Sequence, residues 1–154
     1  MSEKKLLTPL FDRLMGDSDD PQKNYLLNAQ MRESVRRDLE DLLNTRYRCL
    51  SPPASHKELQ KSLLNFGLPD ISSVNLMSKN SRKEFCANIA ECILTYEKRI
   101  KSVKVTTADK LDPEEPNIRF QIEAEIHSSP APEIIIFDSS LNPITQLVNV
   151  AEVG

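Results

Sequence analysis

The sequence predicts an α+β fold, in which three to four helical segments in the amino-terminal part pack on a small carboxy-terminal antiparallel sheet of three to four strands. Two observations predict it. Apolar residues recur at helical spacing up to about residue 98, and at every second position beyond residue 100. The helical and strand segments also form two consecutive blocks, without the alternation of strand and helix that is typical of parallel sheets.

Length and composition indicate the number of domains. The chain has 154 residues, of which 39% are hydrophobic and 28% charged, and such values are typical of a soluble globular protein. This length supports one domain with its own core, but not comfortably two. We therefore expect a single α+β domain over residues 21–154, preceded by a docking arm and acidic linker at residues 1–20.

The arm contains an amphipathic segment. The apolar residues that share one side of its short predicted helix are Leu6, Leu7, Leu10, Phe11 and Leu14. Gly16 and the Asp-rich run at 17–21 end this helix. The segment is suited to docking on another protein, but it could equally fold back on its own domain, and the residues alone leave both possibilities open.

The first helix of the domain is predicted to follow Ser34, because serine commonly caps helices. The residues expected to share its core face are Val35, Leu39, Leu42, Leu43 and Arg46. Acidic neighbours dilute the basic run of Arg32, Arg36 and Arg37. We expect that run to form a solvated face of the helix.

Two further helices are predicted from capping boxes, in which a Ser is followed three residues later by a Glu. One begins at Ser55, ends at Gly67 and is expected to bury Leu59, Leu63 and Phe66. The other begins at Ser81 and runs to about residue 98. Its expected apolar face consists of Phe85, Ile89, Cys92, Ile93 and Tyr96.

Strand periodicity begins after residue 100, where Val103 and Val105 alternate with a lysine. The clearest strand is 118–126, in which apolar residues alternate with Arg119, Gln121, Glu123 and Glu125. A third strand is predicted at 134–137, a turn at 138–143, and a fourth strand within 144–150. An open sheet of this size has two edges, whose unpaired backbone groups can pair with an extended segment.

Charge and residue usage exclude several function classes. The formal net charge of −3 opposes a general affinity for nucleic acid. Three glycines, at positions 16, 67 and 154, cannot form a phosphate-binding loop. Three cysteines without a CxxC pair, together with two histidines, make a structural zinc site improbable, so we expect no metal and no cofactor.

The cysteines and the apolar runs bear on location. Free thiols in apolar helical segments favour a reducing compartment, and we expect a cytoplasmic protein. The amino terminus lacks the apolar run of a signal peptide, and no stretch approaches the roughly 20 apolar residues of a membrane span. We therefore expect no direct insertion into a membrane.

One catalytic hypothesis survives, in which a pair of carboxylates acts on a sugar. Its candidates are Glu97, Glu123 and Glu125, although the last two lie on the polar face of a predicted strand and the chain has no Trp to stack on sugars. Glu97 and Arg99 lie where the last helix gives way to the first strand. The residues alone favour an exposed acid and base at a helix end over a fixed pair.

Four segments together resemble one known family. They are residues 10–14, which read LFDRL, residues 32–46, residues 66–70, which read FGLPD, and residues 96–100, which read YEKRI. In order and spacing they are similar to the baseplate wedge proteins of contractile injection machines, specifically the type VI secretion component called TssE. The last segment resembles the family's Glu-Pro-Arg signature, except that Lys98 replaces the proline.

The resemblance implies a non-enzymatic structural role. A wedge subunit of this kind would join the baseplate to the first ring of the contractile sheath and help to initiate sheath polymerisation by strand addition. The implied partners are the wedge subunits TssF, TssG and TssK and the sheath subunits TssB and TssC, in a cytoplasmic complex docked near the inner membrane. Family members have also carried a lysozyme label, so peptidoglycan hydrolysis is the alternative.

The resemblance also implies which residues bind partners. Glu97 and Arg99 become candidates for an ionic contact that orders the helix-to-strand junction or locks neighbouring subunits together. The complete set of expected partner-binding residues is Glu97, Arg99, Leu10, Phe11, Leu14 and Arg119.

Overall fold

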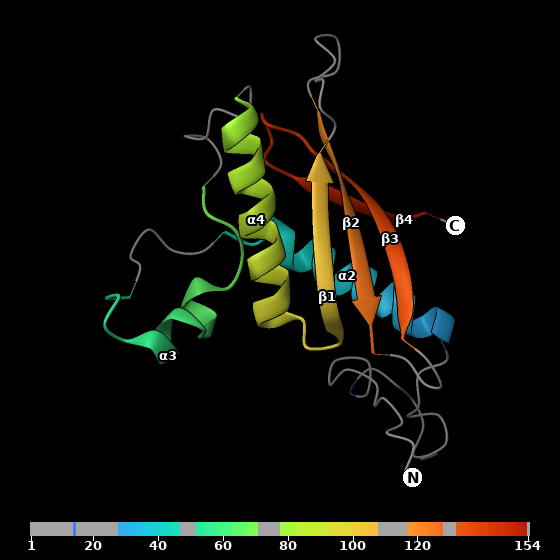
Figure 1. Ribbon diagram of the computed structural model, residues 1–154, viewed down its shortest axis with the longest axis horizontal. Coiled ribbons are helices and arrows are strands. Elements are labelled where there is room, and N and C mark those ends of the chain that lie inside the picture. Colours follow the sequence, from blue (N-terminus) through green and yellow to red (C-terminus); the bar gives the residue numbers. More distant parts are fainter. Residues whose placement is uncertain are drawn as a thin grey trace.

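The fold is shown by a computed structural model that describes residue 14 and residues 28–46, 52–70, 78–107, 117–127 and 132–153 (Figure 1). Its helices are α2 (Asn28–Asn44), α3 (Lys57–Gln60), the 3-10 helix η2 (Leu63–Asn65) and α4 (Lys79–Tyr96). Its strands are β1 (Ile100–Thr107), β2 (Ile118–Ile126), β3 (Glu133–Leu141) and β4 (Val148–Glu152). The predicted α+β class, with helices before an antiparallel sheet, is confirmed.

The sheet is a four-stranded meander in the order β1-β2-β3-β4, and every neighbouring pair is antiparallel. A register shift between Ile100 and Ser102 marks a bulge at the start of β1. From Ser102 to Thr107 the pairing of β1 with β2 is continuous. The sheet therefore has two edges, β1 on one side and β4 on the other.

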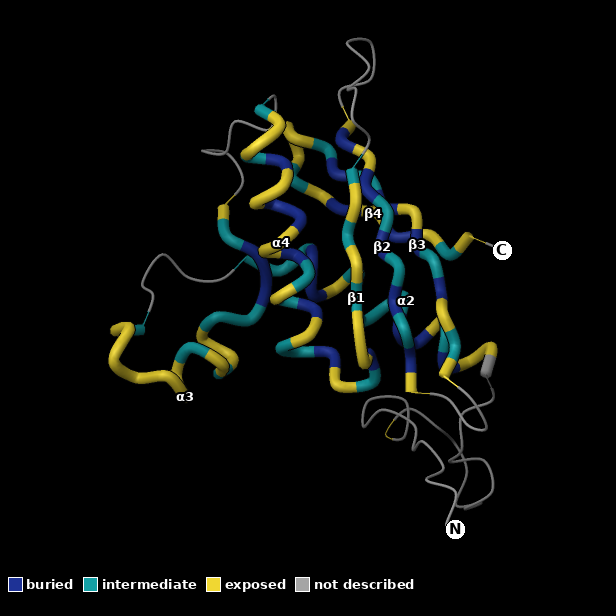
Figure 2. Tube along the Cα trace, in the orientation of Figure 1, coloured by how far each residue is buried: buried dark blue, intermediate teal, exposed yellow. Residues whose placement is uncertain are grey.

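The two long helices cover one face of the sheet, where α4 packs against β1 and α2 packs against β4. Buried residues of the strands alternate with more exposed ones, as Figure 2 shows along β2 and β3. The apolar core between helices and sheet includes fully buried side chains from each layer, among them Val35, Leu39, Ile89, Ile122 and Phe137. The opposite face of the sheet carries the polar residues of β2, together with Ile134 and Ile136 of β3.

Helix α2 begins earlier than the sequence predicts. It includes residues 28–33, so Ser34 lies inside the helix, 4% exposed, and does not cap it. The predicted core residues Val35, Leu39, Leu42 and Leu43 are buried, whereas Arg46 lies beyond the helix end. A local capping rule could not detect the earlier start.

The predicted solvated face of α2 is wrong in part, because two of its arginines contact the sheet. Arg32 forms ion pairs with Glu133 of β3 and Glu152 of β4. Arg36 donates from Nη1 to the carbonyl oxygen of Val150, 3.0 Å away, and pairs with Glu33 and Glu40 on its own helix. These contacts attach α2 to β3 and β4.

The second predicted helix is wrong in its cap and in its buried face. Helix α3 has four residues, is preceded by His56 and receives no side-chain cap from Ser55. Leu59 and Leu63 are 40% and 83% exposed, because so short a helix followed by a 3-10 turn cannot lay a continuous face on the core. Phe66 alone packs inward, edge to face on Tyr96.

Gly67 ends this segment for a steric reason. Its φ is +106°, and a Cβ built there would lie 2.3 Å from the backbone oxygen of Thr45. The close approach lets the N–H of Leu68 donate to that same oxygen at 2.9 Å. A residue with a side chain would push the two chain segments apart.

Helix α4 follows Ser78 and ends at Tyr96, so the predicted capping box at Ser81 lies within the helix. The predicted core residues Phe85, Ile89 and Ile93 are buried, and Cys92 and Tyr96 are partly buried against the same core.

The turn predicted at 138–143 is wrong in its position. β3 continues through Leu141, because the inward alternation persists with Ser139 and Leu141, both buried. The turn to β4 lies at 142–147, where Asn142 Oδ1 accepts from the N–H of Ile144 at 2.9 Å. None of the helices in the described part of the chain combines the length and apolar character needed to cross a bilayer.

Candidate functional site

The junction between α4 and β1 consists of residues 97–99 and turns tightly. The N–H of Glu97 donates to the carbonyl of Ile93 at 2.8 Å, and the N–H of Ile100 donates to the carbonyl of Glu97 at 3.2 Å. The helix therefore ends and the strand begins within one turn of backbone. This geometry brings the side chains of Glu97 and Arg99 together.

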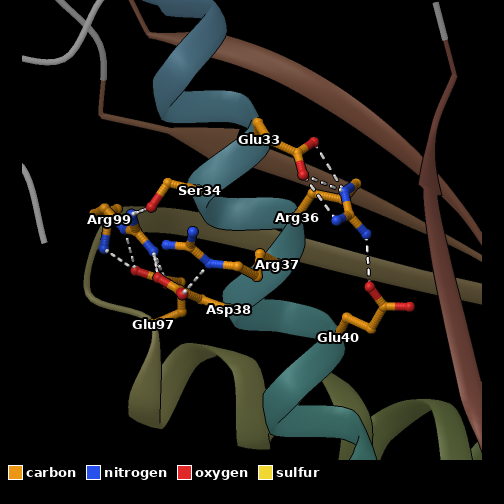
Figure 3. Close-up of polar contacts among 8 residues, drawn as sticks. All are labelled: Glu33, Ser34, Arg36, Arg37, Asp38, Glu40, Glu97 and Arg99. Atoms are coloured by element: carbon orange, nitrogen blue, oxygen red, sulfur yellow. Dashed lines mark hydrogen bonds and ion pairs between the residues drawn. The ribbon is translucent and has the colours of Figure 1, made fainter. Parts of the chain in front are cut away.

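Glu97 and Arg99 form a close ion pair (Figure 3). Arg99 donates to Glu97 Oε1 from Nε at 2.8 Å and from its backbone N–H at 3.0 Å, and Nη2 donates to Oε2 at 2.5 Å. The two side chains are only 11% and 15% exposed. The exposed pair that the residues alone favour is therefore wrong, and the pair is fixed in the protein.

Arg99 also reaches helix α2. Its Nη1 donates to Ser34 Oγ at 3.0 Å, and its Nη2 pairs with Asp38, one helical turn further along. The carbonyl of Arg99 accepts from the N–H of His127, just past the end of β2, at 2.9 Å. One residue thus connects α2, the junction and the sheet.

The charges around Arg99 keep its guanidinium protonated. Burial acts to lower the pKa of Arg99, but its hydrogen bonds and charge pairs with Glu97 and Asp38 outweigh burial and raise that pKa above its ordinary value. Burial raises the pKa of Asp38, and the attraction of Arg99 offsets this only in part. The cation is held by two acids, and removal of the cation would leave both of them uncompensated.

The edge formed by β4 is closed by side chains of α2. Asn44 donates from Nδ2 to the carbonyl of Val148 at 2.8 Å and accepts from the N–H of Val148 at 2.7 Å. Arg36 binds the carbonyl of Val150. The N–H and C=O of Val148 and the C=O of Val150 are therefore occupied, and a further strand could not pair with them.

The edge formed by β1 is open. In an antiparallel strand, the N–H and C=O groups of successive residues point to alternate sides. The backbone groups of Val148 point away from β3. When this alternation is followed through the residue pairings of the sheet, the backbone groups of Val103 and Val105 point away from β2. Among the described residues, no hydrogen bond outside the ladder reaches the backbone of Val103 or Val105. β1 therefore offers free donors and acceptors directly after the Arg99 junction.

Of the remaining predicted site residues, the structure describes Arg119 and Leu14. Arg119 is exposed on the polar face of β2, beside a shallow hollow of about 560 Å³ that Gln121 and Asp138 also line. Leu14 is 75% exposed, and Leu10 and Phe11 lie outside the described residues. The division between arm and domain stays a prediction.

Four residues of the site were not predicted from the sequence: Ser34, Arg36, Asp38 and Asn44. Ser34 and Asp38 are spaced i, i+4, which places two polar side chains beside an apolar stripe. That spacing is a usable signal for a polar contact made by α2. Asn44, at the carboxyl end of the helix, carried no comparable signal.

Two of the three carboxylates in the catalytic hypothesis, Glu97 and Glu125, are held by hydrogen bonds within the protein. Both oxygens of Glu97 accept hydrogen bonds from Arg99. Hydrogen bonds from Lys101 and Ser102 lower the pKa of Glu125, whereas a general acid needs a raised one. The arrangement is suited to holding structure rather than to proton transfer.

Comparison with known proteins gives the family. Residues 29–131 match the family described as baseplate wedge protein gp25. The anti-adapter protein IraD of Salmonella paratyphi A is 29% identical over 123 residues, which span 80% of this chain and 82% of that protein. A chain in a solved baseplate complex from the type VI secretion system shares the fold, with a TM-score of 0.50 and 21% identity over 73% of this chain and 94% of that one. The match covers most of the chain and confirms the predicted resemblance, so the protein belongs to the gp25 family of baseplate wedge proteins.

Proposed function

We propose that this protein is a TssE-like, non-enzymatic subunit of a type VI secretion baseplate. It joins wedge subunits to the first ring of the contractile sheath and helps to start sheath polymerisation by accepting a strand. Membership of the wedge family and the fold shared with a chain of a type VI baseplate complex support this role.

The observation that carries the proposal is the difference between the two edges of the sheet. α2 occupies the β4 edge through Asn44 and Arg36, whereas the β1 edge keeps free backbone groups at Val103 and Val105. Strand addition needs such an unpaired edge, since main-chain hydrogen bonds supply its affinity and register. A chain that acts by itself would gain nothing from this exposed edge, which favours aggregation.

The Arg99 junction supports the same role. It fixes where β1 leaves α4, so the open edge is presented in one geometry. Pre-organised surfaces bind more tightly because less ordering free energy is lost on association. Glu97 and Arg99 thus act on partners by positioning β1, and the expected partners are TssF, TssG, TssK, TssB and TssC in the cytoplasm near the inner membrane.

The test is affinity purification of the tagged protein from cells that carry the secretion cluster, followed by mass spectrometry. Wild type is expected to retain wedge and sheath subunits, whereas Arg99→Ala loses them. Because that variant is expected to be less stable, Arg99→Lys, which keeps the charge but not the two-pronged hydrogen bonding, is purified beside it, with circular dichroism to verify folding. Lys98→Ala, at the exposed neighbouring residue, is the matched control. Recovery of wild type without any wedge or sheath subunit contradicts the proposal.

A second candidate follows from the similarity to the anti-adapter protein. In that case the chain would bind a single adapter protein and regulate it, without entering a large assembly. Size-exclusion chromatography of the native complex separates the two, because a regulator would elute as a monomer or small heterodimer. Neither role involves hydrolysis, so the purified protein should leave peptidoglycan intact.

A further inference from the structure

We propose that a groove beside α3 and η2 binds an amphipathic helix of a partner protein, which carries an acidic residue next to its apolar face. This leucine groove has a volume of about 660 Å³ and is lined by Thr45, Arg46, Leu59, Ser62, Leu63, Leu64 and Phe66. None of these residues belongs to β1, so the inference goes beyond the proposed function and concerns a second surface of the molecule.

The groove exposes large aliphatic side chains close together. Leu63 is 83% exposed, Leu64 49% and Leu59 40%. A single exposed leucine is ordinary, whereas several that gather in one groove mark a surface that another molecule covers. Because α3 and η2 are too short to turn these side chains onto the core, the covering molecule has to supply their apolar contacts.

The backbone beside the groove determines the conformation of the occupant. The N–H groups of Ser62 and Phe66 donate to carbonyls of the same segment, and the N–H of Leu64 donates to Ser62 Oγ. The carbonyls of Leu59, Ser62 and Leu63 accept hydrogen bonds within this segment. An extended occupant would find few partners for its own backbone, whereas a helix pairs its backbone groups internally. The occupant is therefore a helix, whose side chains at i, i+3 and i+4 pack on the leucines.

Arg46 determines the charge of the occupant. Its guanidinium donates to the backbone carbonyls of Leu43, Thr45 and Gln146. No ion pair among the described residues includes Arg46, and Asp70 attracts it only from beyond ion-pair distance. None of the residues that line the groove is acidic. A carboxylate on the occupant would meet this cation at the side of an apolar surface, where opposite charges attract more strongly than in bulk water.

The amino-terminal arm of the chain has similar chemistry, because Asp12 lies among the apolar residues of its predicted helix. Leu14 is the one residue of this arm that the structure describes. It is helical, 75% exposed and not part of the lining of the groove. This placement favours an occupant that comes from another protein.

The experiment titrates the full chain with three fluorescent peptides, each held helical by a side-chain lactam. One has Leu at i, i+3, i+4 and i+7 and an Asp beside this apolar face, one has Lys in place of the Asp, and one has the leucines of the Asp peptide spread around the helix. By fluorescence anisotropy, the Asp peptide should bind about fivefold more tightly than the Lys peptide and at least about tenfold more tightly than the scrambled one. Methyl NMR should show shifts at Leu59, Leu63 and Leu64 when the Asp peptide binds.

Two variants locate the binding. Leu63→Ser should weaken binding of the Asp peptide at least about tenfold and keep the fold, because this side chain is largely exposed. Ile134→Ser, at a residue that is 71% exposed on the opposite face of the sheet, is the matched control and should bind as wild type does. Arg46→Gln keeps amide donors without the charge, so it should bind the Asp and Lys peptides equally.

Circular dichroism verifies that each variant is folded. If Arg46→Gln does not fold, the charge is tested on wild type, in which a rise in salt concentration should reduce the preference for the Asp peptide. A preference that salt leaves unchanged would show that charge does not select the occupant.

No binding of the Asp peptide, equal binding of the Lys or scrambled peptide, or wild-type affinity in Leu63→Ser would each overturn the inference. Two further results would assign the groove to a different occupant and overturn it as well. Nuclear Overhauser contacts between Phe11 and Leu63 in the free chain would show that the arm fills the groove. Dimers of the free chain in sedimentation, abolished by Leu63→Ser, would identify a second copy. Purification of wedge and sheath subunits with wild type tests the proposed function separately, whatever the peptides show.

Discussion

Arg99 joins helix α2, the α4–β1 junction and the sheet through polar contacts. It binds Glu97 beside it in the chain and both Ser34 and Asp38 on α2, and its side chain is 15% exposed. Each of these bonds is charge-assisted or lies in a partly dry environment, where an unpaired partner is costly.

Replacement of Arg99 by Ala should lower the free energy of unfolding by about 3–5 kcal/mol, because Glu97 is left buried without a counter-charge. Urea denaturation measures the change. In a double-mutant cycle, Glu97→Ala and Arg99→Ala should couple by roughly 1–3 kcal/mol. Lys98→Ala should stay within about 0.5 kcal/mol of wild type. Additive effects of the two single replacements would show that the pair does not act as a unit.

We expect the protein to lose stability in alkali because of the Cys92 thiol. Burial raises the pKa of Cys92 from 9.0 to about 11. Because the pKa is raised in the folded protein, the thiol contributes fully to the free energy of unfolding below pH 9. This contribution, up to about 2–3 kcal/mol, is lost as the pH rises toward 11. Urea titrations across this pH range should show that the free energy of unfolding falls less steeply with pH for Cys92→Ala than for wild type. Thr95→Ala, on the same helix, should keep the wild-type slope, and an identical slope for Cys92→Ala contradicts the assignment.

At the scale of elements, helix α2 determines which edge of the sheet is available. Its carboxyl end covers β4 with the Asn44 amide, which takes the place of a neighbouring strand at Val148. Its middle contacts the junction through Ser34 and Asp38. One helix therefore closes one edge and braces the start of the other.

Asn44→Ala should open the β4 edge and cost about 1–3 kcal/mol, since the N–H and C=O of Val148 lose their partners. Hydrogen exchange at the Val148 amide should accelerate in proportion. Asn44→Asp keeps an acceptor for the N–H and should have a smaller effect on that amide. Unchanged exchange at Val148 in Asn44→Ala would mean that another group closes this edge.

Gly67→Ala should destabilise the protein by at least about 1–3 kcal/mol, because the residue has a positive φ and its Cβ would meet the Thr45 carbonyl. Gly67→Asn should be no better tolerated. Asparagine accepts a positive φ more readily than alanine does, but it carries the same Cβ. Thermal unfolding measures both, and a well-tolerated Asn would show that φ alone matters.

Periodicity explains which elements could be predicted. The strand at 118–126 and the core residues of α2 and α4 are strongly periodic, and the structure confirms them. The capping boxes at Ser55 and Ser81 are local signals, and tertiary packing overrode both. The polar contacts of Arg99 with Ser34 and of Asn44 with Val148 join residues 65 and 104 positions apart. A local sequence pattern cannot predict contacts between residues so far apart in the chain.

For the whole molecule, the arrangement is a helical layer on one face of a sheet with one closed and one open edge. The sheet meander keeps β1 at an edge, because among the described strands it pairs with β2 alone. The junction that holds β1 lies at the start of that edge. The proposed function therefore places partner binding on the same strand that the Arg99 junction holds in position.

The most direct measurement is an electron cryomicroscopy reconstruction of the assembly purified through this chain. The account predicts an added strand from a neighbouring subunit, hydrogen bonded to Val103 and Val105 of β1, with β4 still covered by Asn44. A reconstruction in which the β1 edge faces solvent, or in which a partner strand pairs with β4, would contradict it.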